Sequence, residues 1–204
     1  MIYLKEQIIH EIVIDKSRFI GVLTPIESVD EIPSILVKIK KDYPKATHYC
    51  SAYVFGKNGE FASANDDGEP SRTAGVPILE ILKQKNLTNI YAVVIRYFGG
   101  IKLGAGGLIR AYAKSPLETL KIGQFYEKIA YEQAEFTFDY SLINKVDLLL
   151  ENKVIIVNKT FDSFVTYKII FNQGDPSILD DVKHLFKEYH LLEKEILHIE
   201  TQLS

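Results

Sequence analysis

The chain has 204 residues, is 47% hydrophobic and 25% charged, and carries a net charge of −3. This composition is typical of an ordinary globular protein and excludes the strongly basic character of a dedicated nucleic-acid binder. The longest uncharged stretches reach about ten residues, roughly half of what a membrane-spanning helix needs. The single cysteine, Cys50, excludes an internal disulfide. We therefore expect a cytoplasmic protein with no membrane partner.

Charge and arginine usage differ along the chain. Residues 1–130 contain 17 lysines and arginines against 14 acidic residues, whereas residues 131–204 contain 7 against 13. A polyanionic partner should therefore meet the N-terminal part. Only four of the 24 basic residues are arginines, and all four lie in that part. Because a guanidinium suits carboxylate or phosphate, each arginine is expected either to bind an anion or to pair with a buried carboxylate. The four are Arg18, Arg72, Arg96 and Arg110.

The N-terminal part reads as alternating strands and helices. Ser28 and Glu31 form a capping box, and apolar residues recur at helical spacing until Pro44. Residues 89–97 are almost continuously apolar, which predicts a strand buried on both faces. Ser115 resembles a second capping box, so the last helix either kinks there or restarts. Strands are predicted at residues 8–15, 18–26, 47–55, 60–64 and 89–97, and helices at residues 28–43, 74–85 and 107–122.

From about residue 131 the pattern changes to that of a second small domain. Strands are predicted around residues 136–140 and at 154–159, 164–171 and 195–201, with helices starting at Ser141 and at Asp175. The second helix should run to about Tyr189, because Asp175 and Pro176 resemble an N-cap followed by a first-turn proline. The order β-α-β-β-α-β is that of a ferredoxin-like domain. We expect an α+β chain with domains at residues 1–131 and 132–204.

The most unusual segment is residues 96–112, which holds five of the twelve glycines between two arginines. A glycine cluster costs conformational entropy on folding, so it needs a reason. One reason is unusual backbone geometry or close packing of a helix on a strand. The other is a strand–loop–helix site whose free N–H groups approach an anion. The segment has neither a Walker A nor a G-x-G-x-x-G spacing. The residues predicted to bind an anion or nucleic acid are Arg96, Gly99, Gly100, Lys102, Gly104, Gly106, Gly107 and Arg110.

A second segment, residues 66–75, is a turn that gathers Asp66, Asp67 and Glu69, followed by Arg72 and Thr73. The three carboxylates could hold a hard cation or act as an acid–base pair. The favoured interpretation is an acidic turn that pairs with Arg72, Arg96 or Arg110. No metal and no cofactor is predicted.

Two further patterns have competing interpretations. His48 and Cys50 lie two apart on one predicted strand and so face the same side. They could form a nucleophilic pair, but Cys50 is expected to be a small buried hydrophobe. Tyr97, Phe98 and Tyr112 could stack on bases or belong to the core, and the core is favoured.

The acidic turn and residues 96–112 resemble the two signatures of the YigZ/IMPACT family. Weaker family blocks match residues 16–19 and 46–53, so the resemblance covers essentially the whole N-terminal domain. One departure is Arg72, where a glycine or another small residue is expected.

The resemblance implies an N-terminal two-layer α/β sandwich similar to domain IV of elongation factor G and to a ribosomal-protein fold. It implies a C-terminal ferredoxin-like domain similar to domain V of that factor. Eukaryotic relatives act in translational control by competing for an activator of a stress-responsive kinase. They do so with an added domain that the printed sequence does not include, so that partner is not transferred.

Three functional hypotheses follow. The first is a non-catalytic protein that associates with RNA or the ribosome, or with a protein of the translation machinery, and regulates translation. The second is a hydrolase or peptidase-like enzyme that uses Asp66, Asp67 or Glu69. The third is a protein–protein interaction module in which the glycine segment is a packing corner. The first hypothesis predicts that Arg96→Ala and Arg110→Ala weaken RNA binding without unfolding the protein.

Overall fold

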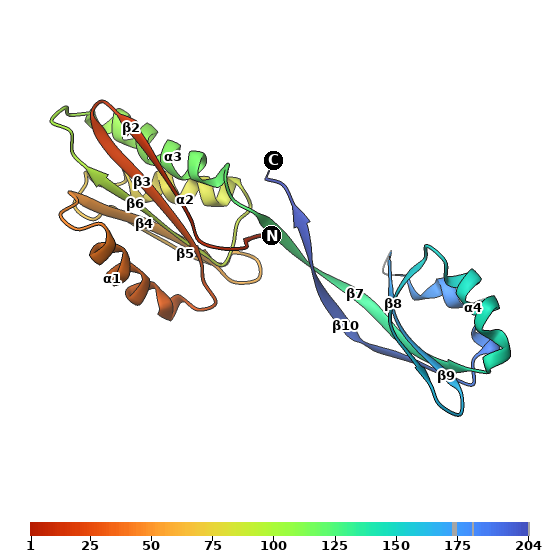
Figure 1. The fold of residues 1–204 in the computed structure, drawn as a ribbon. Coiled ribbons are helices and arrows are strands. Elements are labelled where there is room, and N and C mark those ends of the chain that lie inside the picture. The colour runs from red at the N-terminus through yellow and green to blue at the C-terminus, as the bar shows by residue number, and fades with distance from the viewer. Residues whose placement is uncertain (173–174, 181, 204) are drawn as a thin grey trace. The chain divides into compact units, whose positions relative to one another are not determined.

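The computed structural model describes residues 1–172, 175–180 and 182–203 and forms two compact units (Figure 1). The first unit consists of Met1–Glu127 together with the residues from Ile199 onward, and the second unit is Lys128–His198. The α+β class is confirmed. A boundary between residues 131 and 132, as the limit of independently folding domains, stays a prediction.

The first unit is built on a five-stranded antiparallel sheet of order β2-β3-β6-β4-β5. The central strand β6 is buried at seven of its eight positions, as its apolar sequence predicts. All five strands lie within two residues of their predicted limits. They are β2 (Ile8–Ile14), β3 (Ser17–Pro25), β4 (His48–Phe55), β5 (Phe61–Asn65) and β6 (Ile90–Tyr97).

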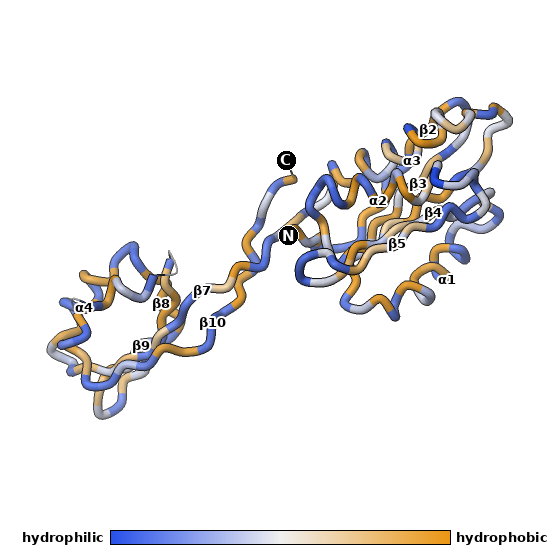
Figure 2. Tube along the Cα trace, turned by 180° about the vertical axis from the view of Figure 1, so that it is seen from behind, coloured by the Kyte–Doolittle hydropathy of each residue, from blue (hydrophilic) through white to orange (hydrophobic). Residues whose placement is uncertain are grey.

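Helices cover both faces of this sheet (Figure 1). One face packs on α2 (Gly75–Gln84) and α3 (Gly104–Leu120), and the other packs on α1 (Ile32–Asp42). Alternation along β3 supplies both cores, because Phe19 and Leu23 join the first and Ile20 and Val22 join the second. Figure 2 shows the hydrophobic colouring along β3 and the alternating colours of α1. The unit thus has three layers, where a two-layer sandwich is the expectation from the resemblance.

The start of α1 follows its sequence signal. Ser28 caps a 3-10 turn at Val29–Glu31 that leads directly into α1. The Ser28 hydroxyl accepts from the Asp30 N–H at 3.1 Å, and the Glu31 carboxylate accepts from the Ser28 N–H at 2.8 Å. The predicted capping box is therefore confirmed.

Helix α3 differs from its prediction at the start and in the middle. It begins at Gly104, three residues early, and continues through Pro116 as one helix. Ser115 does not cap a new helix, because it lies buried against β3. A side chain at Gly21 would collide with Thr119 and crowd the Ser115 hydroxyl, so the bare glycine lets α3 lie close to the sheet. Packing overrides the local capping signal.

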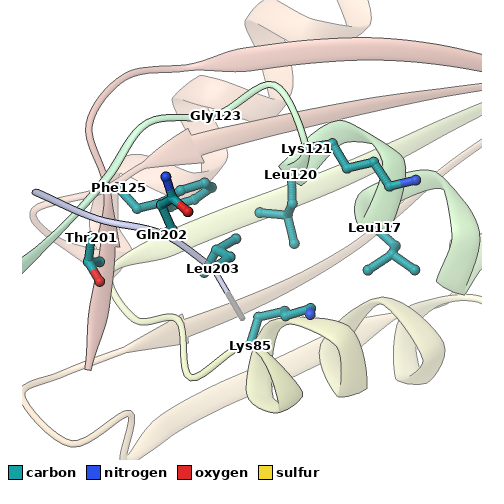
Figure 3. Close-up of a pocket in the computed structure, with 9 residues that line it drawn as sticks. All are labelled: Lys85, Leu117, Leu120, Lys121, Gly123, Phe125, Thr201, Gln202 and Leu203. Carbon is teal, nitrogen blue, oxygen red and sulfur yellow. The ribbon is translucent and has the colours of Figure 1, made fainter.

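The short strand β1 (Ile2–Leu4) is absent from the sequence-based prediction. It pairs antiparallel with Phe125, Tyr126 and Glu127 at the start of β7 (Phe125–Phe138). The end of the chain also packs on this unit, where Leu203 joins the core under α2 and α3. Figure 3 shows the cavity of about 390 Å³ beside it, lined by Thr201, Gln202, Leu203, Lys85, Leu117, Leu120, Lys121, Gly123 and Phe125.

The second unit has the predicted order of elements with one correction. Its strands are β7, β8 (Val154–Phe161), β9 (Val165–Phe171) and β10 (Glu188–Thr201), in the order β10-β7-β9-β8. Helix α4 (Ile143–Leu150) follows a 3-10 turn at Tyr140–Leu142. Its core consists of one face of β7 and β9 with α4.

The predicted helix from Asp175 to Tyr189 is wrong. Asp175 does cap a turn, accepting from the Ser177 N–H at 2.9 Å, but the described residues that follow form 3-10 turns at Pro176–Leu179 and Lys183–Leu185 in place of an α-helix. Strand β10 then begins at Glu188, and Phe186, two residues earlier, stacks on Phe136 of β7 with 4.1 Å between the ring centres. Residue 181, within the predicted helix, lies outside the described residues. No helix in residues 1–172, 175–180 and 182–203 is long and apolar enough to cross a membrane.

Candidate functional site

Asp66 fixes the start of the acidic turn to the start of α2. Its carboxylate accepts from the backbone N–H groups of Arg72 at 2.7 Å, Gly75 at 2.8 Å and Ala74 at 3.0 Å. The N–H groups of Ala74 and Gly75 stand at the start of α2, where a helix leaves its donors unpaired. Partial burial opposes ionisation of Asp66, but the three N–H donors outweigh it and hold the pKa below its ordinary value. Asp66 is therefore a structural cap.

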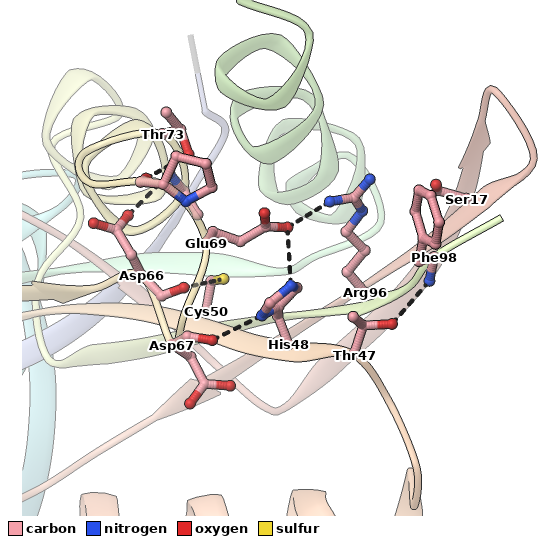
Figure 4. Close-up of polar contacts among 12 residues, drawn as sticks. Ser17, Thr47, His48, Cys50, Asp66, Asp67, Glu69, Thr73, Arg96 and Phe98 are labelled. Carbon is pink, nitrogen blue, oxygen red and sulfur yellow. Dashed lines mark hydrogen bonds and ion pairs between the residues drawn. The ribbon is translucent and has the colours of Figure 1, made fainter. Parts of the chain in front are cut away.

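Asp67 fastens the same turn to β4. Its carboxylate accepts from the Tyr49 N–H at 2.6 Å, and its carbonyl oxygen lies 2.8 Å from His48 Nδ1 (Figure 4). The backbone turns sharply here, with φ of 41° at Asp67 and 85° at Gly68. Both aspartates are thus engaged by the protein's own donors.

Glu69 forms a buried ion pair with Arg96. Arg96 Nη1 donates to Glu69 Oε1 at 2.6 Å, and the two side chains are only 6% and 4% exposed. The Tyr112 hydroxyl donates to the same oxygen at 2.8 Å, and His48 Nε2 lies 3.8 Å from it. The predicted pairing of the acidic turn is confirmed for Arg96. The pair joins the turn to β6 and, through Tyr112, to α3.

The Arg72 side chain makes no ion pair within 4 Å among the described residues, although its charge helps to hold the pKa of Asp66 low. Instead its backbone adopts φ of 64°, the left-handed region that favours glycine. This position is where the resemblance leads one to expect a glycine or a small residue. The turn keeps its shape because the Arg72 N–H donates to Asp66. Thr73 completes the turn by donating its hydroxyl to the Pro70 carbonyl at 2.6 Å.

The guanidinium of Arg96 lies between two aromatic rings. Its Cζ atom is 5.4 Å from the ring centre of Phe19 and 5.4 Å from that of Phe98. Figure 4 shows Arg96 with Glu69 on one side and Phe98 on the other. Arg96 Nε is buried and has no hydrogen-bond partner among the residues that the structure describes. A buried N–H without an acceptor is unfavourable in a native structure and points to a missing partner.

Arg96 also lines a cavity of about 330 Å³ at the start of α3. The opposite side of the cavity is formed by Gly104 and Ala105 in the first turn of that helix. Lys102 and Glu69 also line it. The cavity therefore joins a buried arginine, a lysine and a helix N-terminus, which is an arrangement that favours a negative ligand.

Close packing and unusual backbone conformation together explain most of the glycine cluster. A side chain at Gly99 would collide with the backbone of Lys16 and Ser17, which lie directly against it. Gly100 and Gly104 have φ of 90° and 67°, which disfavour any other residue. Close packing therefore accounts for Gly99, whereas the positive φ accounts for Gly100 and Gly104, where an added Cβ atom would meet nothing within 4 Å.

Gly106 is the exception. A Cβ atom placed there would lie 3.6 Å from Arg110 Nη1, an ordinary contact, and would meet nothing else. At Gly107 the nearest atom would be Leu103 Cβ at 2.9 Å, which is too close. Packing thus requires no glycine at position 106, where an alanine would favour the helix. A bare, exposed backbone in the first turn suits close approach of a ligand.

The first turn of α3 presents free donors. The N-cap residue Leu103 offers no side-chain acceptor to the N–H groups that begin the helix. Lys102 and Arg110 are exposed on either side of this turn. Within the described part of the chain neither has an ion-pair partner within 4 Å. A second cavity, of about 320 Å³, is lined by Gly107, Arg110 and Lys114, with Asp15 on its rim.

Cys50 and Tyr112 belong to the buried network. The Cys50 thiol donates to the Asp66 carbonyl at 3.0 Å, and burial raises its pKa to about 12. Such a thiol is no nucleophile at neutral pH, in agreement with the buried-hydrophobe interpretation. Burial also raises the pKa of Tyr112, which packs edge-on against Phe19. Sequence reasoning missed the part that His48 plays in the turn, although its spacing from Cys50 was a visible signal.

Comparison with known proteins places these features in a family. The model of the Impact N-terminal domain matches residues 15–120, which span the acidic turn and α3. The IMPACT family member YvyE of Bacillus subtilis (strain 168) is 46% identical over 166 residues, covering 78% of this chain and 76% of the relative. The IMPACT family member YigZ of Escherichia coli (strain K12) is 32% identical over 161 residues, covering 76% and 78% respectively.

A solved structure of a hypothetical protein is 27% identical and matches with a TM-score of 0.60. The match covers 95% of this chain and 97% of that one, so the similarity includes both units. Because the domain model matches more than half of the chain and YvyE matches over three quarters of its own length, the chain belongs to the IMPACT family.

Proposed function

We propose that this chain is a non-catalytic RNA- or ribosome-associated protein of the cytoplasm that acts in the regulation of translation. The observation that carries the proposal is the uncapped first turn of α3, flanked by the exposed cations Lys102 and Arg110. Free N–H groups, a helix dipole and two cations together bind phosphate oxygens.

The phosphate contacts are assigned to Lys102, Arg110 and the N–H groups at the start of α3. Arg96, a predicted contact, takes a different part, because its Nη1 is occupied by Glu69 and its side chain is almost fully buried. Instead, Arg96 lines the cavity and is fixed there by its ion pair with Glu69. The role in translational control rests on the family resemblance. A protein of the translation machinery remains a further candidate partner.

The hydrolase hypothesis depends on carboxylates that are free to act. Asp66, Asp67 and Glu69 each accept hydrogen bonds from the protein's own groups, which leaves that hypothesis without a supporting geometry. Across residues 1–172, 175–180 and 182–203, no group of three metal-ligating side chains lies close enough to hold an ion. The phosphate-binding proposal has the better structural support.

The test measures binding of a short single-stranded RNA by fluorescence anisotropy between 50 and 200 mM salt. Lys102→Ala and Arg110→Ala should each weaken binding and reduce the salt slope by about 0.7, the contribution of one phosphate contact on a single strand. Lys38→Ala is the matched control, because Lys38 is an exposed lysine on α1, across the sheet. Co-sedimentation with ribosomes provides a second readout. Absence of RNA binding and of co-sedimentation at low salt would refute the proposal.

A further inference from the structure

The cavity beside α3 has more apolar wall than phosphate recognition needs. Besides Arg96 and Lys102, it is lined by Pro70, Phe98, Leu103 and Leu108. Its volume of about 330 Å³ lies at the lower end of the range for small-ligand sites. A phosphate group needs only Lys102 and the first turn of α3. The apolar part of the wall therefore indicates a ligand that carries a flat apolar group next to its negative charge.

Phe98 is placed to stack on such a group. Its side chain is 45% exposed although it directly follows the buried strand β6. The Arg96 guanidinium lies 5.4 Å from its ring centre, and the Phe98 N–H donates to the Thr47 hydroxyl at 3.0 Å. The ring is therefore held by its backbone and by one neighbour while nearly half of it stays open. Exposed aromatic rings beside cationic grooves are the usual platforms for unpaired bases.

Arg96 supplies the second observation. Its side chain is 6% exposed, and it lines the cavity beside the Phe98 ring. An arginine next to an exposed aromatic ring adds a cation–π contribution to base stacking. The phosphate sites at Gly104 and Ala105 line the same cavity. One nucleotide could therefore fill the cavity with its base and meet the α3 terminus with its phosphate.

We propose that this cavity is a base pocket, which takes one unpaired nucleobase of a single-stranded RNA while the attached phosphate lies on the first turn of α3. The inference rests on the proposed function and specifies its ligand. Bases inside a duplex are stacked and cannot enter such a cavity, so the site selects single strands, loops or ends over duplex RNA.

The experiment compares three probes: a mixed-sequence single-stranded RNA 12-mer, its duplex, and inorganic polyphosphate. Phe98→Ala should weaken binding of the single strand by about 5- to 150-fold, the range for loss of one stacked base. It should leave binding of the duplex and of polyphosphate unchanged. Phe98→Trp should retain the single-strand affinity, because it keeps a stacking ring. Phe61→Ala is the matched control, since Phe61 is 58% exposed on the edge strand β5.

Each other outcome overturns the inference. If Phe98→Ala leaves single-strand binding unchanged, or weakens all three probes equally, no base occupies the cavity. The phosphate proposal would then survive provided that Lys102→Ala and Arg110→Ala still weaken binding. If none of the three probes binds the unmodified protein, the base pocket and the proposed function fail together. Thermal unfolding of Phe98→Ala, expected to match that of the unmodified protein within a few degrees, excludes misfolding as the cause of a loss.

Discussion

Replacing Arg96 with alanine tests the architecture of the site most directly. The substitution leaves the buried Glu69 carboxylate with the Tyr112 hydroxyl at 2.8 Å and His48 Nε2 at 3.8 Å as its remaining neighbours. Removing one partner of a buried ion pair costs about 3–5 kcal/mol, because the remaining charge is uncompensated. For a chain of this length, that corresponds to a fall in melting temperature of about 6–20 °C.

The assay is thermal unfolding followed by far-ultraviolet circular dichroism, together with urea titration. Arg110→Ala is the matched control, because Arg110 is exposed and should change stability by less than about 0.5 kcal/mol. The double variant Glu69→Gln with Arg96→Met removes both charges and should lose less stability than Arg96→Ala alone. A loss below about 1 kcal/mol for Arg96→Ala would refute the buried-pair reasoning. The large loss of stability expected here for Arg96→Ala differs from the sequence-based expectation, in which this substitution weakens binding without unfolding the protein.

Four further substitutions probe the turn and the glycine segment. Gly106→Ala should raise the free energy of unfolding by about 0.5–1 kcal/mol, measured in urea, while weakening RNA binding. Gly99→Ala should instead destabilise strongly, because its Cβ would collide with backbone; equal effects of the two would contradict the assignment. Arg72→Gly should raise the melting temperature. It removes the strain of a left-handed φ, about 1–2 kcal/mol, and this gain should exceed the loss from the greater chain entropy of glycine in the unfolded state. The low folded-state pKa of Asp66 contributes stability that is present above the unfolded value near 3.9 and is lost as pH falls through the folded value. Asp66→Asn should therefore flatten the stability profile below about pH 4, which urea titrations at pH 2–6 would check.

Local sequence signals predicted the parts of the fold that local physics determines. The capping box at Ser28 and Glu31 satisfies N–H groups within one turn, so its residues alone specify it. The apolar run in β6 likewise fixes a central strand. By contrast, β1 forms by pairing with residues 125–127, and no pattern in Ile2–Leu4 predicts that distant partner. The Ser115 signal was overridden because Gly21 lets α3 pack closely on β3.

The sequence indicated which residues form the site but not which partner each of them contacts. The scarcity of arginine indicated that each one has a specific partner. Arg18 pairs with Glu11 on the surface at 2.8 Å, whereas Arg96 pairs with Glu69 in the interior at 2.6 Å. Sequence alone could not separate these cases, because the difference lies in which side of the sheet and which loop covers each guanidinium. Arg110 is left without an ion pair in the described part of the chain, so it alone among these three is placed to meet a partner.

The acidic turn helps to fix the position of α3 but does not neutralise the cations at the start of that helix. The Glu69 carboxylate neutralises the charge of Arg96. It also accepts a hydrogen bond from Tyr112, which lies about two turns after α3 begins. None of the three carboxylates of the turn lies within 4 Å of Lys102 or Arg110 among the described residues. An approaching anion therefore meets two uncompensated cations and a positive helix end, fixed in place by a neutral buried pair. It follows that substitutions of Asp66 and Asp67, which do not line the cavity beside α3, should alter RNA binding only as far as they alter stability. Lys102→Ala should instead alter binding at unchanged stability.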